Sequence, residues 1–62
     1  MLFSIETDRG QCLVEAHNEP QARKYMREEF GRSTTIRKVS RKQKDIDWAK
    51  SMGARIHDAK GE

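Results

Sequence analysis

Two short segments near the start of the chain alternate apolar and polar residues with the period of two that a half-buried β-strand requires. The first is centred on Phe3 and Ile5, and the turn-forming sequence Asp8-Arg9-Gly10 separates it from the second. Together they predict a β-hairpin, and we favour the register that gives both strands one buried face, made of Phe3, Ile5, Cys12, Val14 and Ala16. A bulge at Gly10 would instead bring Leu13 to this face, whereas the favoured register leaves Leu13 unexplained.

The next segment has the spacing of an amphipathic helix. Asn18 is suited to the N-cap, Pro20 to the first turn, and Gly31 to the end of the helix. Between them, apolar residues recur at intervals of three and four and form one stripe of Ala22, Tyr25, Met26 and Phe30. The opposite side of this helix is predicted to be solvated, and it carries Arg23, Lys24, Arg27 and Glu28.

Residues 34–39 are β-branched at both ends and predict a third strand. Ile36 and Val39 are three residues apart, and a regular strand cannot point both of them inward. Either the strand is bulged, or Val39 already belongs to the following turn.

A second helix is predicted to begin near Ser40 or near Asp45 and to end at Gly53. If Ile46 and Ala49 face the core, Trp48 points about 130° away from them, towards solvent or a partner, and Met52 lies between the two directions. Alternatively, the helix turns to bury Trp48 and Met52. Because an exposed tryptophan is typical of an interface anchor, Trp48 and Met52 form a candidate protein interface.

These elements predict an α+β fold of order β-β-α-β-α. Placing the third strand beside the first gives a small three-stranded antiparallel sheet, with the first helix packed on one face. The second, C-terminal helix would cover the end of the core or serve another chain. We expect one domain over residues 1–53 and a frayed polar tail over residues 54–62, in which only Ile56 is suited to docking.

Length and composition limit what such a fold contains. A chain of 62 residues buries only about 60% of the surface that its unfolded form exposes, so we expect marginal stability or help from a second copy. The chain has one cysteine and no apolar stretch of membrane-spanning length. We therefore expect a protein of the reduced cytoplasm with no membrane partner.

Positive charge is concentrated in residues 32–44, which hold six basic residues and no acid, whereas the rest of the chain has seven basic and ten acidic residues. This stretch is a candidate nucleic-acid contact, made of Arg32, Arg37, Lys38, Arg41, Lys42 and Lys44. A solvated edge strand protected by cations explains the same residues, and no aromatic residue is present to stack on bases. Weak, sequence-independent nucleic-acid binding is therefore the alternative function.

Catalytic and cofactor chemistry is not indicated. Cys12 and His17 would lie roughly 16 Å apart on one extended strand, too far for a nucleophile and its base. With His57, they match no zinc-binding spacing. Asp45 and Asp47 are two residues apart and point to different sides of a helix. We expect a protein that is not an enzyme and that uses no cofactor, metal or small-molecule ligand.

The run Asp45-Ile46-Asp47-Trp48-Ala49-Lys50-Ser51-Met52-Gly53, following a compact hairpin, helix and strand, resembles small uncharacterised proteins encoded by phages and prophages. This resemblance brings no biochemical role and no functional residues with it. It implies that the protein works in a bacterial host cytoplasm by binding macromolecules. The sequence as a whole therefore predicts a non-catalytic interaction module that binds a protein partner or a second copy of itself.

Overall fold

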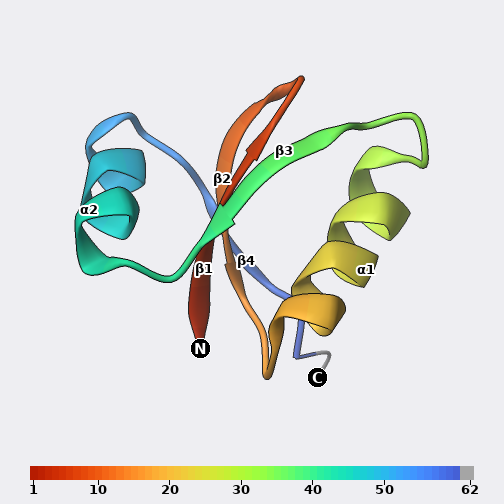
Figure 1. Cartoon of the computed structure of the whole chain (residues 1–62), viewed down its shortest axis with the longest axis horizontal. Helices are drawn as coiled ribbons and strands as arrows, with labels where there is room; N and C mark the ends of the chain where they lie inside the picture. Colours follow the sequence, from red (N-terminus) through yellow and green to blue (C-terminus); the bar gives the residue numbers. More distant parts are fainter. Residues whose placement is uncertain (61–62) are drawn as a thin grey trace.

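The computed structural model describes residues 1–60 and shows a four-stranded sheet between two helices, with α1 on one face and α2 on the other (Figure 1). The elements in chain order are β1 (Leu2–Thr7), β2 (Gly10–Glu15), α1 (Glu19–Phe30), β3 (Ile36–Ser40), α2 (Gln43–Ser51) and β4 (Ile56–Asp58). The strand order is β3-β1-β2-β4, in which β1 is antiparallel to both neighbours and β4 is parallel to β2. The chain is thus a small α+β fold with a mixed sheet.

The hairpin has the register that the apolar alternation favoured. Phe3 pairs with Val14, and Ile5 pairs with Cys12, so these side chains share one face of the sheet. The cluster buried beneath α1 is made of Phe3, Ile5, Cys12, Val14, Ala16, Ala22 and Met26. Gly10 closes the turn at a φ of 129°, a backbone angle that a side chain would strain.

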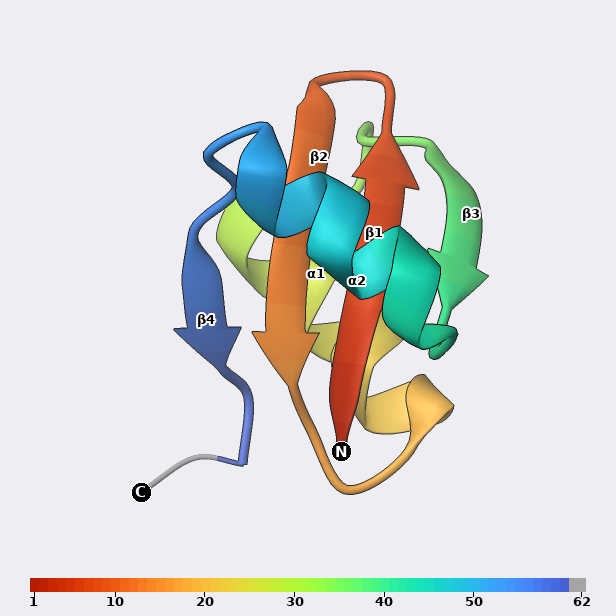
Figure 2. The same ribbon diagram turned by 90° about the vertical axis from the view of Figure 1, so that its left-hand side faces the viewer.

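Leu13 belongs to a second core on the opposite face of the sheet. Its side chain is fully buried beneath α2, where it packs against Ile46 and Ala49. Figure 2 shows α2 crossing β1 and β2 diagonally on this face. The second helix therefore covers a whole layer rather than the end of the core, because Leu13 gives the sheet a second apolar face that must be buried.

β3 is bulged, as the spacing of its apolar residues required. Its pairing with β1 shifts between Lys38, which lies opposite Glu6, and Ile36, which lies opposite Thr7. The extra residue lets Ile36 and Val39 both pack against the cluster beneath α1. The predicted place of this strand, antiparallel to β1 and at the edge of the sheet, is confirmed.

β4 corrects two expectations, the sheet of three antiparallel strands and the frayed tail from residue 54. Residues 56–58 pair in parallel with β2, and the pairing is extended by backbone bonds from Leu13 N to Arg55 O (3.0 Å) and from Ala59 N to Glu15 O (2.8 Å). The physical reason is that β2 buries backbone groups that need partners on both sides. Three residues are too short for a strand pattern to show in the sequence. Residues 61 and 62 of the expected tail lie outside the described residues.

Candidate interaction surfaces

The exposed side of α2 carries the two residues that the sequence singled out as a protein interface. Ile46 and Ala49 are buried against the sheet, with exposed fractions of 5% and 0%, whereas Trp48 and Met52 are 53% and 65% exposed. The sequence allowed α2 to bury either Ile46 and Ala49 or Trp48 and Met52. The helix adopts the first orientation, which points Trp48 outward. We call Trp48 and Met52 the α2 patch.

α2 is positioned by a polar contact at its start. The N-cap position, Lys42, makes no side-chain capping bond. Instead, Ser40 Oγ accepts a bond from the Lys42 backbone N–H (3.2 Å) and donates to Asp45 Oδ2 (2.5 Å). This bond from Ser40, together with nearby lysines led by Lys38, lowers the pKa of Asp45. The contact holds Asp45 in place one turn before Trp48.

A hollow of about 290 Å³ lies beside Trp48, between α2 and the hairpin end of the sheet. Trp48 shares its lining with Ser4, Glu6, Gln11, Lys38, Ser40 and Asp45. Gln11 Nε2 donates to Ser4 Oγ across its floor (2.5 Å), and Lys38 Nζ lies 3.8 Å from Asp45 Oδ2 at its rim. The hollow is therefore polar and carries both signs of charge, next to an exposed indole.

The basic residues of the stretch 32–44 do not come together at one site. Lys38 lies at the rim of the hollow beside Trp48. Arg41 is turned towards the start of the chain, where its Nη1 donates to Met1 Sδ (3.3 Å), and Lys42 lies with it in a separate shallow depression.

Arg32, Arg37 and Lys44 complete this distribution. Arg37 is exposed on β3, and Lys44 is exposed in the first turn of α2. Arg32 follows α1 and faces another part of the molecule altogether. The stretch that looked continuous in the sequence is thus divided among surfaces on both sides of the sheet.

Arg32 belongs to a groove between α1 and β3, which has a volume of about 730 Å³. The charged residues that line this groove are Arg23, Lys24, Arg27, Glu28 and Arg32. Ile36 is the apolar residue of the lining. Sequence reasoning assigned the α1 residues to a solvated outer face and missed this site. The one available signal was the four-residue spacing of Arg23 and Arg27, which places them on the same side of the helix.

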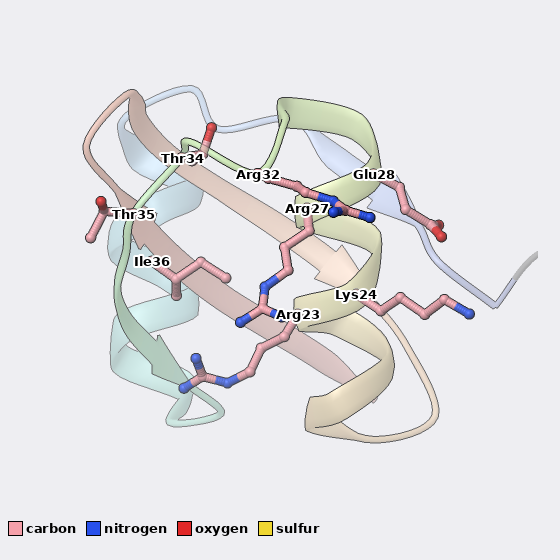
Figure 3. A pocket seen from close by; sticks show the side chains of 8 residues that line it. All are labelled: Arg23, Lys24, Arg27, Glu28, Arg32, Thr34, Thr35 and Ile36. Atoms are coloured by element: carbon pink, nitrogen blue, oxygen red, sulfur yellow. The ribbon is translucent and has the colours of Figure 1, made fainter.

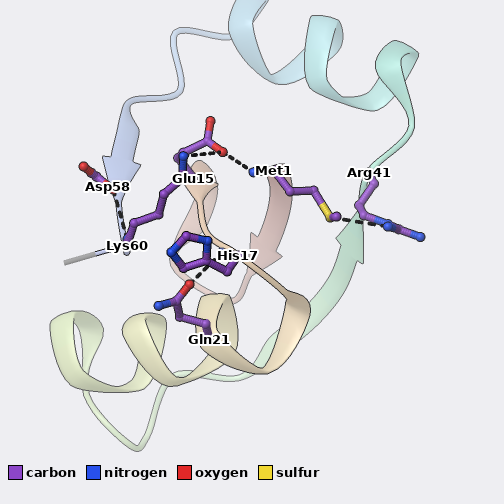
Figure 4. A network of polar contacts seen from close by, with 7 residues as sticks. All are labelled: Met1, Glu15, His17, Gln21, Arg41, Asp58 and Lys60. Atoms are coloured by element: carbon purple, nitrogen blue, oxygen red, sulfur yellow. Dashed lines mark hydrogen bonds and ion pairs between the residues drawn. The ribbon is translucent and has the colours of Figure 1, made fainter. Parts of the chain in front are cut away.

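Cys12 and His17 are not brought together. Cys12 is buried, its Sγ lies 3.4 Å from Met26 Sδ, and burial raises the pKa of its thiol to about 11. A thiol held protonated in this way is a poor nucleophile at neutral pH. His17 is exposed at the start of α1, where its backbone N–H donates to Gln21 Oε1 (2.6 Å; Figure 4).

A polar network ties the end of the described chain to the sheet near this point. Glu15 pairs with the Met1 amine and lies 3.6 Å from Lys60 Nζ (Figure 4). The Lys60 backbone N–H also donates to Asp58 Oδ1 (3.0 Å). Within residues 1–60, no group of three histidine, cysteine or acidic side chains is arranged to hold a metal ion. These contacts serve to fix β4 and the segment after it.

Comparisons with protein-family models, with curated proteins and with solved structures find no match to this chain. Among the described residues, neither helix has the length and apolar character needed to cross a bilayer. The functional argument therefore rests on the surfaces described above.

Proposed function

We propose that this protein is a non-catalytic interaction module and that the α2 patch binds a protein partner. The observation that carries the proposal is the exposure of Trp48 on a helix whose opposite side is fully packed. Tryptophan is enriched among the residues that dominate binding energy, and Met52, one turn further on, adds a flexible apolar side chain beside it. α2 already has its core contacts through Ile46 and Ala49, so binding at the patch leaves the fold unchanged.

The partner that fits this surface best is a second copy of the chain. The lining of the hollow beside Trp48 includes one cation, Lys38, and two carboxylates, Glu6 and Asp45. A surface that carries both signs of charge is able to complement itself across a twofold axis, with Lys38 of each copy facing Glu6 of the other. The indole and the hollow also lie side by side, so each copy offers both a protruding side chain and a recess.

Sedimentation velocity over a range of protein concentrations, together with tryptophan fluorescence, tests this proposal. Trp48 is the only tryptophan, so the emission reports on the α2 patch alone. We expect red-shifted emission in dilute protein and a blue shift as dimers form. Trp48→Ala should change the free energy of unfolding by less than about 1 kcal/mol, while weakening dimerisation by about 2 kcal/mol or more, roughly 30-fold.

Ile56→Ala is the matched control. Ile56 is an exposed apolar residue (61%) that pairs with Leu13 in the sheet, but it does not line the hollow beside Trp48. Its replacement should leave dimerisation intact. Equal weakening by both variants would mean general apolar association rather than a contact at Trp48. A monomer with constant emission at every concentration would reject a second copy as the partner.

A further inference from the structure

The groove between α1 and β3 concentrates arginine side chains that lie apart in the sequence. Figure 3 shows Arg23 and Arg27 reaching from α1 towards β3, with Ile36 of β3 pointing back at them. Arg32 lies over the end of the same helix, whereas Lys24 and Glu28 extend on its other side. Arg23 and Arg27 are one helical turn apart, so their guanidinium groups follow each other along the groove.

The positive charge of this groove is poorly compensated. Arg23 Nε is paired with Glu19 (2.9 Å), but within residues 1–60 neither Arg27 nor Arg32 has an acidic group within ion-pair distance. Among the residues that the structure describes, Glu28 is the only acidic one in the lining. Two of the three guanidinium groups that line the groove, those of Arg27 and Arg32, therefore have no acidic partner among the described residues, an arrangement that an anionic ligand stabilises.

Hydrogen bonds fix the backbone that forms the wall of the groove. Gly31 N donates to Arg27 O (3.0 Å), and Thr34 Oγ1 donates to Phe30 O (2.8 Å), which fixes the loop after α1. The backbone groups of Thr35 and the turn residue Asp8 bond reciprocally, from Asp8 N to Thr35 O (3.1 Å) and from Thr35 N to Asp8 Oδ1 (3.2 Å). The start of β3 is thus tied to the hairpin turn, so little ordering is required when a ligand binds.

The charged surface continues past the groove along β3. This strand lies at one end of the sheet and pairs only with β1 among the described elements. Its Lys38 does not add to this surface, because it lies on the α2 side of the sheet, 3.8 Å from Asp45 Oδ2. The strand does carry the exposed residue Arg37, and a strand of five residues spans roughly 16 Å. The positive surface is therefore longer than a single small anion requires.

We propose that the groove between α1 and β3 binds the phosphate groups of a nucleic-acid backbone, with Arg23, Arg27 and Arg32 as the main contacts. Planar guanidinium groups match phosphate oxygens in pairs, which ammonium groups do not. None of the described residues that line the groove is aromatic, so the bases are not stacked and their sequence is not read. This site shares only Arg32 with the basic stretch expected from the sequence, and it does not depend on the α2 patch.

Fluorescence polarisation with labelled single-stranded and duplex oligonucleotides tests the proposal. The variant Arg27→Gln/Arg32→Gln removes two groove charges. Lys44→Gln/Lys50→Gln removes two exposed charges from α2, on the opposite face of the sheet, and serves as the matched control. At about 50 mM salt, we expect the groove variant to bind at least roughly tenfold more weakly than the parent. The slope of the logarithm of the association constant against the logarithm of the salt concentration should fall in magnitude by about 1.5 to 2. The control should retain most of the affinity and the slope.

Three results would overturn the proposal. Equal loss in both double variants would show that net charge, not the groove, governs binding. Competition by poly-L-glutamate as effective as competition by unlabelled oligonucleotide would show an acidic polypeptide site instead. The absence of binding at about 50 mM salt would reject the nucleic-acid ligand. Thermal melting of each variant confirms that it is folded, and sedimentation of the same samples reports on the α2 patch separately.

Discussion

Tyr25 Oη lies 3.1 Å from His57 Nδ1, a contact that joins α1 to β4 across 32 positions of the sequence. The two rings also pack together with their centroids 5.8 Å apart, and Phe30 meets the same imidazole edge-on at 5.9 Å. These contacts dock the last strand onto the layer formed by α1. Residues 54–60, which look like part of a polar tail in the sequence, therefore belong to the folded molecule.

Replacing His57 should loosen this strand. His57→Ala removes one hydrogen bond and two aromatic contacts, and we expect the free energy of unfolding to fall by about 1 to 2 kcal/mol. Hydrogen exchange should show the loss first at the amides that join β4 to β2. Arg55→Ala, an exposed change in the adjoining turn, should stay within about 0.5 kcal/mol of the parent. Unchanged protection of β4 in His57→Ala would show that the backbone pairing alone holds the strand.

The second core should be as sensitive as the first. Leu13 is fully buried beneath α2, and Leu13→Ala should cost about 2 to 5 kcal/mol in urea denaturation, most of the stability of so small a chain. Leu13→Met keeps the volume and should cost less than about 1.5 kcal/mol. If Leu13→Ala unfolds at the urea midpoint of the parent, α2 is not held by this core.

The first half of the fold could be predicted from the sequence because its signals are local. Asn18 Oδ1 accepts from Gln21 N (2.9 Å) at the start of α1, and Gly31 ends the helix at a φ of 94°, as their residue types indicated. The alternation of apolar and polar residues likewise selected the correct hairpin register. Each of these features depends on neighbours within a few positions.

The rest depends on contacts that the sequence does not display. β4 has three residues and no apolar pattern, and it is held by backbone pairing with β2 and by the contacts of His57 with the distant Tyr25 and Phe30. Leu13 was the trace of a second layer that the sequence argument left unexplained. Leu2, which is also apolar and lies outside the favoured face, packs against the same second core. The groove was missed for the same reason, since nothing in α1 indicates that β3 lies beside Arg23 and Arg27.

The thiol of Cys12 should be protected from modification. Burial raises its pKa to about 11, so only a small fraction is ionised at about pH 8. We expect iodoacetamide to alkylate the native protein about 100-fold more slowly than the urea-unfolded protein. Raising the pKa of a thiol by one unit lowers its ionised fraction about tenfold, and the pKa of Cys12 rises from 9.0 to about 11 on folding. Mass spectrometry over time measures both rates. Alkylation of the native protein as fast as the unfolded chain would place Cys12 outside the core.

Acid should weaken the attachment of α2. The bond from Ser40 Oγ, and secondarily the charge of Lys38, lower the pKa of Asp45 in the folded protein. A carboxyl group whose pKa is lower when folded stabilises the protein above its unfolded pKa, near 4, and loses this contribution as the pH falls through the folded value. We call the decrease of the free energy of unfolding between about pH 6 and pH 2 the acid limb. Chemical denaturation over this range should therefore show a shallower acid limb in Ser40→Ala than in the parent.

Lys38→Gln should flatten the acid limb less than Ser40→Ala does, because the hydrogen bond is the larger cause of the lowered pKa and the lysine lies 3.8 Å away at an exposed position. The pKa of Glu15 is lowered by its bond to the Met1 amine and by Lys60. Protonation of Glu15 therefore still lowers the free energy of unfolding in acid in every variant, and part of the acid limb remains. A limb in Ser40→Ala as steep as that of the parent would show that the Ser40–Asp45 contact does not stabilise the carboxylate. The start of α2, and with it the position of Trp48, would then be held by the packing of Ile46 and Ala49 alone.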